Sequence, residues 1–165
     1  MNAKKYTTVA ITIFMLLALT ATVAFAANPH FVSATASGPD KDGNLLVKFK
    51  IAGLGDNVTT TVTANGDASA VYACKNKGGN FPSDPKKQEV SGPVSASGEF
   101  TSGKNGQITG TLKLSPPPQP DLSCPGNQVV TLAMVTYTNV SVTEDNAGTQ
   151  VILGTFSATY NGYQP

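Results

Sequence analysis

Apolar and polar residues alternate one by one along much of this chain of 165 residues, and this period of two most limits its possible folds. Within residues 45–51 every odd position is apolar, whereas Lys48 and Lys50 lie between them. Such alternation is typical of a β-strand with one buried face and one wet face. Five runs show it or a related Val- and Thr-rich composition: residues 45–51, 58–62, 108–114, 129–143 and 151–160. No stretch after residue 26 keeps helical spacing over three turns, so we predict an all-β protein.

Turn-forming residues separate these runs. The chain contains 16 Gly and 11 Pro, which favours many short elements. Asn-Gly and Asp-Gly pairs supply the positive φ that tight hairpin turns need. Three such pairs occur: Asp42-Gly43, Asn65-Gly66 and Asn105-Gly106. We therefore predict three hairpins: residues 31–37 with 44–52, 57–64 with 67–74, and 94–102 with 107–114.

Two longer segments are rich in residues that interrupt strands. Residues 75–87 are rich in Lys, Gly and Pro, and residues 115–127 contain five prolines. Because proline cannot donate a ladder hydrogen bond, both segments are predicted to be loops. About eight strands with frequent turns predict a two-sheet antiparallel sandwich of the immunoglobulin-like type, with a closed barrel as the alternative.

The N-terminus has the organisation of a secretory signal peptide. Lys4 and Lys5 precede an apolar stretch that ends in Ala24-Phe25-Ala26, the small-x-small pattern that signal peptidase requires. A membrane anchor is the alternative, but threonines interrupt the stretch, which is barely long enough to cross the hydrocarbon. We therefore predict a signal peptide over residues 1–26 and a single β-sandwich domain over residues 27–165.

The processed chain is expected to be secreted without an anchor. Removal of Lys4 and Lys5 leaves nine of the eleven lysines against ten acidic residues, a net charge of −1, which does not favour nucleic acid as a partner. The cleavage site is not followed by the Cys of a lipoprotein, and the C-terminus has no removable apolar tail, so we expect no stable membrane anchor. In a eukaryotic cell, Asn57 and Asn139 match the pattern for glycosylation.

The only two cysteines, Cys74 and Cys124, both belong to the part predicted to be exported. A pair of cysteines in an oxidising compartment indicates a disulfide. Such a bond closes a loop of about 51 residues, for which chain entropy gives roughly 4 kcal/mol of stabilisation. Two separate buried thiols are the alternative. Each cysteine borders or lies in one of the two predicted loops, so a disulfide would hold both loops at one end of the domain.

Three residues near Cys74 are candidates for binding a partner. Phe81 lies between Asn80 and Pro82 in the lysine-rich loop, where its ring could form an exposed platform, and Lys86 and Lys87 follow closely. The alternative is that Phe81 folds under the loop as its hydrophobic anchor, because large apolar side chains are more often buried.

Catalytic and cofactor motifs are not evident in the sequence. Asp40 opens a turn that resembles the start of a calcium loop, but the twelfth position is Ile51 rather than Glu. His30 is the sole histidine, and no nucleophile motif accompanies it. Two of the ten carboxylates could cleave a glycoside if they faced each other, although most lie in predicted turns. We therefore expect no cofactor and no enzymatic activity.

Several segments of the processed chain carry a resemblance. They are Ala27-Asn28-Pro29-His30-Phe31, residues 72–74 with 78–80, residues 90–98, Leu122-Ser123-Cys124-Pro125, and residues 135–140. These segments resemble a family of small secreted proteins of uncharacterised function from soil bacteria and fungi. The resemblance extends over essentially the whole processed chain. It implies export, one domain and the cysteine pair, and it brings no catalytic motif.

Together these features predict a secreted, non-catalytic β-sandwich. Its partner would be an extracellular protein or a polysaccharide, or its role would be structural at the cell surface. The alternative function is a small extracellular hydrolase with two carboxylates about 5 to 10 Å apart across a cleft.

The signal peptide predicts the first residue of the exported protein. Ala24 and Ala26 are the small pair correctly spaced behind the apolar stretch, so the exported chain should begin at Ala27. N-terminal sequencing of protein from a culture supernatant measures this directly. An intact chain that stays in the membrane fraction would contradict the prediction.

Overall fold

The computed structural model describes residues 28–165, in which seven β-strands form two antiparallel sheets. The strands are β1 (His30–Ser37), β2 (Leu45–Ala52), β3 (Thr59–Lys75), β4 (Lys87–Thr101), β5 (Ile108–Leu114), β6 (Val129–Glu144) and β7 (Thr149–Thr159). The predicted all-β, two-sheet antiparallel sandwich is confirmed. The predicted signal peptide over residues 1–26 lies outside the described residues. Within residues 28–165 no helix is long and apolar enough to cross a membrane.

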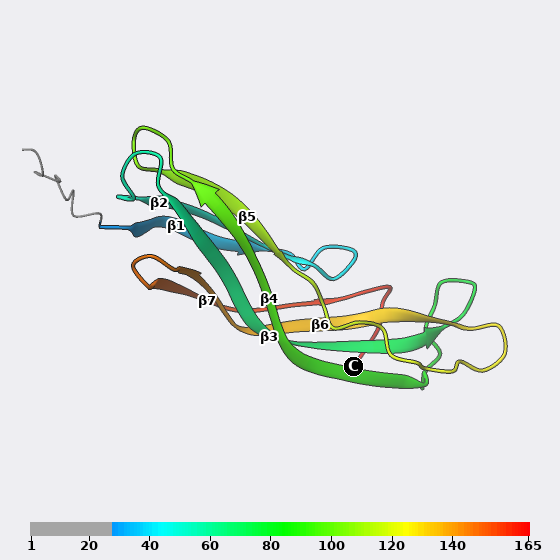
Figure 1. Cartoon of the computed structure of the whole chain (residues 1–165). Helices are drawn as coiled ribbons and strands as arrows, with labels where there is room; N and C mark the ends of the chain where they lie inside the picture. Colours follow the sequence, from blue (N-terminus) through cyan, green and yellow to red (C-terminus); the bar gives the residue numbers. More distant parts are fainter. Residues whose placement is uncertain (1–27) are drawn as a thin grey trace, which may run out of the picture.

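The two sheets pack face to face as the layers of the sandwich (Figure 1). One contains three strands in the order β1-β2-β5, and the other contains four strands in the order β4-β3-β6-β7. The chain therefore passes from one sheet to the other after β2, after β4 and after β5. As a result, β2 and β3, β4 and β5, and β5 and β6 are consecutive in the sequence but do not pair. The side chains on each outer face therefore come from segments that are far apart in the chain.

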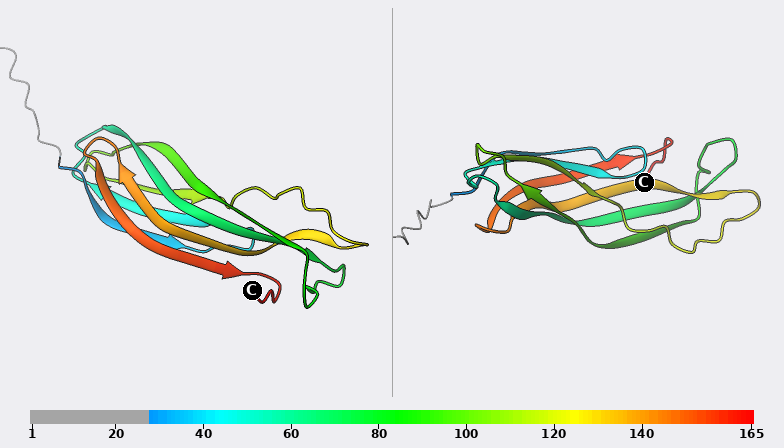
Figure 2. Two further views of the ribbon diagram at one scale, coloured as in Figure 1. Left: turned by 90° about the horizontal axis from the view of Figure 1, so that it is seen from below. Right: turned by 45° about the horizontal axis from the view of Figure 1, so that its top comes forward.

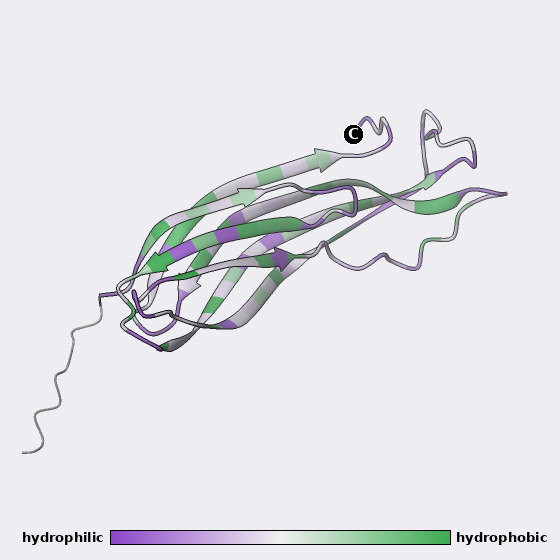
Figure 3. Cartoon of the chain, turned by 90° about the horizontal axis from the view of Figure 1, so that it is seen from above, coloured by the Kyte–Doolittle hydropathy of each residue, from purple (hydrophilic) through white to green (hydrophobic). Residues whose placement is uncertain are grey.

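The period of two in the sequence places the core between the sheets. In β2 the odd positions are the inner face, and Leu45, Val47, Phe49 and Ile51 are each at most 2% exposed. The opposite sheet contributes a matching set of buried side chains: Val62, Ala64, Ala68, Ala70, Val135, Tyr137, Val140 and Val142. Figure 3 shows the resulting alternation of apolar and polar bands along the strands. Each buried side chain of the size of Val or Leu contributes about 1.5–3 kcal/mol.

One aromatic contact joins the central strand of the three-stranded sheet to an edge strand of the four-stranded sheet. The rings of Phe49 in β2 and Phe100 in β4 meet edge to face, with centroids 5.0 Å apart. Both rings lie over Gly110 in β5, where a Cβ atom would come within 2.5 Å of each ring. Glycine at this position therefore makes room for the pair, which stabilises the side of the sandwich at the β4–β5 connection.

The first predicted hairpin is confirmed. β1 and β2 pair from His30↔Ala52 to Ser37↔Leu46, and the turn between them contains Gly43 at φ 88°. A backbone in this left-handed region suits glycine, because a Cβ atom is disfavoured there.

The second predicted hairpin is wrong, because Asn65 and Gly66 lie inside the continuous strand β3. The strand pairs with β4 on one side and with β6 on the other, and these two ladders stabilise the extended strand more than the turn preference of Asn65-Gly66 stabilises a hairpin. The β3–β6 register shifts beside Gly66, where β6 carries one extra residue and Asn139 has φ 54°. Instead of turning the chain, Asn65-Gly66 accommodates a β-bulge in the neighbouring strand.

The third predicted hairpin is also wrong as a pair of hydrogen-bonded strands. Asn105 and Gly106 do form a turn, with Gly106 at φ 66° and its N–H bonded to the Gly103 carbonyl at 2.9 Å. However, β4 and β5 belong to different sheets, so this turn carries the chain across the sandwich. β5 pairs with β2 instead.

The strands of the two sheets differ in length. β3, β4 and β6 have 17, 15 and 16 residues, whereas β1, β2 and β5 have 8, 8 and 7. The long strands run beyond the short sheet toward the end of the molecule where the loops 76–86 and 115–128 lie (Figure 2). There, beyond the end of β5, the proline-rich segment 115–128 covers the inner face of the four-stranded sheet in place of a strand. Pro117 is buried, and the Tyr72 hydroxyl donates a 2.6 Å hydrogen bond to its carbonyl.

Three tyrosine hydroxyls connect the four-stranded layer to segments of the other layer. Besides Tyr72, the fully buried Tyr137 donates to the Gly43 carbonyl at 2.7 Å, and Tyr160 donates to the Asp40 carbonyl at 2.7 Å. Burial raises the pKa of all three hydroxyls above the ordinary value of 10.0. Each tyrosine thus places an apolar ring in or beside the core and satisfies a carbonyl in the β1–β2 turn or in the proline-rich segment.

These tyrosines predict a loss of stability in alkali. Because their folded-state pKa values are raised, their stabilising contribution is fully present below about pH 10 and is lost as the pH rises further. Tyr137→Phe should lower the free energy of unfolding at pH 7 by about 1–2 kcal/mol, since the Gly43 carbonyl loses its donor. It should also make the alkaline loss shallower than in the wild type. Urea unfolding at several pH values from 7 to about 11 measures both effects, and an unchanged alkaline slope would contradict the prediction.

Candidate functional site

The end of the molecule with the two long loops is closed by a covalent bond. Cys74 and Cys124 form a disulfide with Cα atoms 5.5 Å apart, as the sequence predicts. The Lys86 side chain donates a 2.8 Å hydrogen bond to the Ser123 carbonyl, and the Cys74 N–H donates to the Lys86 carbonyl at 2.9 Å. The loops 76–86 and 115–128 are therefore tied to β3 and to each other.

Phe81 lies on the outer face of the four-stranded sheet. Its ring packs edge to face on Tyr163, with centroids 5.3 Å apart, and it borders a small cluster that contains Ala73 and Ala133. The side chain is half-buried. This arrangement matches the alternative interpretation of the sequence, in which Phe81 anchors its own loop.

Lys86 and Lys87 point to different partners. Lys86 contacts the proline-rich segment, whereas the Lys87 ammonium donates to the Tyr163 hydroxyl at 3.2 Å and lies 5.8 Å from the centroid of that ring. The structure thus brings Phe81 and Lys87 together through Tyr163 and leaves Lys86 on another side. Sequence reasoning missed Tyr163, because the last six residues carry neither alternation nor a motif.

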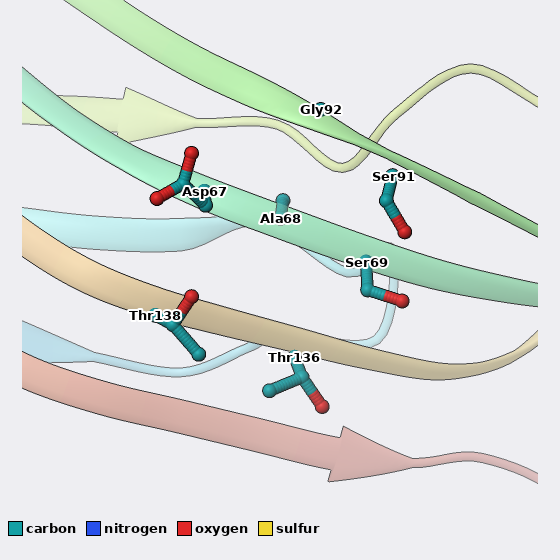
Figure 4. A pocket seen from close by; sticks show the side chains of 7 residues that line it. All are labelled: Asp67, Ala68, Ser69, Ser91, Gly92, Thr136 and Thr138. Atoms are coloured by element: carbon teal, nitrogen blue, oxygen red, sulfur yellow. The ribbon is translucent and has the colours of Figure 1, made fainter.

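A shallow hollow lies near the middle of the outer face of the four-stranded sheet (Figure 4). It has a volume of about 380 Å³ and is lined by side chains from three neighbouring strands: Asp67 and Ser69 of β3, Ser91 of β4, and Thr136 and Thr138 of β6. The strand register places Ser69 directly between Ser91 and Thr136, so a row of hydroxyl groups crosses the sheet. A second hollow of about 420 Å³ shares Asp67 and includes Asn65, Ser95 and Asn139.

The carboxylates near these hollows already have polar partners. Asp67 accepts a 3.0 Å hydrogen bond from the Asn139 side chain. Glu89 accepts hydrogen bonds from the hydroxyls of Ser69 and Ser91. Such a surface can exchange hydrogen bonds with a ligand that is rich in hydroxyl groups.

Three hollows on the described surface are each lined by a single carboxylate side chain. Asp67 borders the two hollows just described, and Glu89 borders a third of about 270 Å³ beside Tyr163. Glu144 is fully buried, and its carboxylate accepts hydrogen bonds from the Thr60 hydroxyl and from two backbone N–H groups of the following turn. Glu144 therefore has a structural role between β6 and β3.

The remaining motifs of the sequence have structural explanations. The Asp40 carboxylate accepts hydrogen bonds from the backbone N–H groups of Asp42 and Asn44, each at 2.9 Å. The bond from Asn44 is the main cause that lowers the pKa of Asp40. These contacts form the hairpin turn that the sequence favoured over a calcium loop. Within residues 28–165, no three His, Cys, Asp or Glu side chains are grouped so that they could hold a metal ion.

No protein family, no curated protein sequence and no solved structure matches the chain. Its function is therefore inferred from the geometry of its own surfaces.

The disulfide predicts a large effect on stability. Replacing both cysteines, Cys74→Ala with Cys124→Ala, should lower the free energy of unfolding by roughly 2 to 5 kcal/mol, because the unfolded chain is no longer constrained. Denaturant unfolding measures this loss. The matched control Lys86→Ala, which removes only the exposed hydrogen bond between the loops, should cost less than about 1 kcal/mol. Free thiols in the native protein, or a loss in the cysteine variant as small as in the control, would contradict the prediction.

Proposed function

We propose that the protein is an exported, non-catalytic β-sandwich that binds a partner outside the cell through its exposed sheet faces. One observation carries this proposal: the outer face of the four-stranded sheet is a broad, hydroxyl-rich surface with shallow hollows. The hydroxyl-bearing residues on it include Thr59, Thr61, Thr63 and Ser69 of β3, Ser91, Ser95 and Ser97 of β4, and Thr136, Thr138 and Thr143 of β6. An extracellular polysaccharide or the polar surface of an extracellular protein fits such a face.

Export is supported by two independent features. The Cys74–Cys124 disulfide is a bond typical of oxidising compartments outside the cytosol. The residues before the sandwich have the charge, apolar length and small-x-small ending of a signal peptide. Both features fit a role in the extracellular space or on the cell surface.

We also infer that the sandwich is of the immunoglobulin-like type. In support, three strands face four, all hydrogen-bonded neighbours are antiparallel, and the chain changes sheet between β2 and β3 and between β4 and β5. Domains of this type carry recognition on loops or sheet faces held by a rigid core.

A carboxylate-pair hydrolase is less well supported than a binding protein. That mechanism needs two carboxylates about 5 to 10 Å apart on either side of the scissile bond. Each hollow described above offers one, Asp67 or Glu89, and both already accept hydrogen bonds from neighbouring side chains.

The proposal predicts binding without turnover. Labelled mature protein should sediment with the insoluble extracellular matrix or envelope of the producing cells in a saturable manner. It should release no product in a broad screen of glycosidase and protease substrates. Asp67→Asn and Glu89→Gln serve as matched variants, because each removes one carboxylate from a hollow without changing its size. Turnover that is abolished by either variant would establish the hydrolase instead.

A further inference from the structure

The outer face of the three-stranded sheet is a regular grid of lysine and hydroxyl side chains. The ladders β1–β2 and β2–β5 align the outward-facing residues in three rows across the sheet: Ser33–Lys50–Thr109, Thr35–Lys48–Thr111, and Ser37–Leu46–Lys113. We call these nine residues the lysine face. Three of them are cationic, five carry a hydroxyl group, and one is apolar.

The three lysines of this face lack neutralising partners. Among residues 28–165 the one ion pair joins Lys41 to Asp42 in the β1–β2 turn and involves none of these three lysines. No carboxylate belongs to the lysine face, and the side chains of Lys48 and Lys113 are exposed, whereas Lys50 is half-buried. The face therefore presents three unpaired positive charges to the solvent.

The spacing of these charges is set by the sheet. Lys50 and Lys48 are two residues apart on β2, which places their Cα atoms about 7 Å apart. Lys113 stands on β5 opposite Leu46, one diagonal step from Lys48, again about 7–8 Å away. The Cα atoms of the three lysines thus form a row that runs along the strands, with Lys113 one strand to the side. A linear polymer with repeated negative charges could contact all three at once.

The two outer faces of the sandwich differ in charge. The outer face of the four-stranded sheet carries Asp67, Glu89 and Glu99, with Lys87 at its end. The net charge of the processed chain is close to zero, but its charges are unevenly distributed, and the lysine face carries three lysines and no acidic residue. A polyanion would be attracted to one face and repelled by the other.

We infer that the lysine face binds a linear acidic polysaccharide, an inference that rests on the proposed extracellular binding function. The hydroxyl groups between the lysines can pair with sugar hydroxyls, whereas the lysines pair with carboxylate or sulfate groups. The face contains no aromatic side chain on which a nucleobase could stack, which disfavours single-stranded nucleic acid. Leu46 is its one apolar residue, too little to insert into a lipid surface.

Two triple variants with the same change in net charge test this inference. The first, Lys48→Gln with Lys50→Gln and Lys113→Gln, removes the positive charge of the lysine face. The matched control, Lys75→Gln with Lys77→Gln and Lys104→Gln, removes three lysines from loops and strand ends elsewhere. Far-UV circular dichroism and thermal unfolding establish that both variants fold, which is expected because most of the replaced side chains are exposed.

Binding is measured by calorimetry or biolayer interferometry with polygalacturonate, with neutral dextran and with single-stranded DNA as probes. The wild type should bind polygalacturonate and not dextran, and its affinity should fall as salt rises, because exposed charges are screened within about 10 Å at 0.1 M. The lysine-face variant should lose about tenfold or more in affinity, and the control variant less than about twofold.

The other outcomes overturn the inference in distinguishable ways. If the wild type sediments with extracellular material and the lysine-face variant does so equally well, the proposed function stands and the lysine face is not its site. If the control variant alone loses affinity, the acidic polymer binds outside the lysine face. Equal or tighter binding of single-stranded DNA would show that the partner class is wrong. If the wild type binds neither polygalacturonate nor extracellular material, both the inference and the proposed function fail.

Discussion

The inner face of the four-stranded sheet is longer than the sheet that covers it, and much of the remaining structure follows from this mismatch. β3 and β6 continue beyond the end of β5 at Leu114, so inner-face side chains such as Tyr72 and Cys74 need another cover. The proline-rich segment 115–128 provides it. Because proline has no N–H, such a segment can lie against an apolar face with few donors to satisfy, and its carbonyl at Pro117 finds a donor in Tyr72.

The disulfide and the tyrosine hydroxyls hold this arrangement together. Cys74–Cys124 fixes the far part of the proline-rich segment, while Tyr137 and Tyr160 bind carbonyls of the β1–β2 turn from the opposite layer. Because these contacts join the two layers of the sandwich, the surface side chains keep fixed positions on the sheets. Such preorganisation reduces the entropy that is lost when a partner binds, and it suits a protein that recognises an extended polymer with a flat face.

The proposed function and the lysine face both depend on which strands are neighbours. Lys48 and Lys113 stand on one surface because β5 leaves the sheet of β4 and pairs with β2. The same crossing leaves Glu89 and Glu99 on the opposite surface with β3. The presence of lysines on one face and of Glu89 and Glu99 on the other is therefore a consequence of topology, and it makes the outer face of the three-stranded sheet locally basic in a near-neutral protein.

The sequence by itself determined the all-β class, the inward residues of β2 and β5, the first hairpin, the two loops and the disulfide. These follow from alternation, turn residues and cysteine count, all of which are local or compositional signals. Only the tertiary structure decided that Asn65-Gly66 stays inside β3, that β5 pairs with β2, and that Phe81 packs on Tyr163. The physical reason is that a local turn preference stabilises the chain less than the hydrogen-bonded ladders on both sides of a strand of 17 residues. Those ladders join segments that are far apart in the chain, so a local signal does not reveal them.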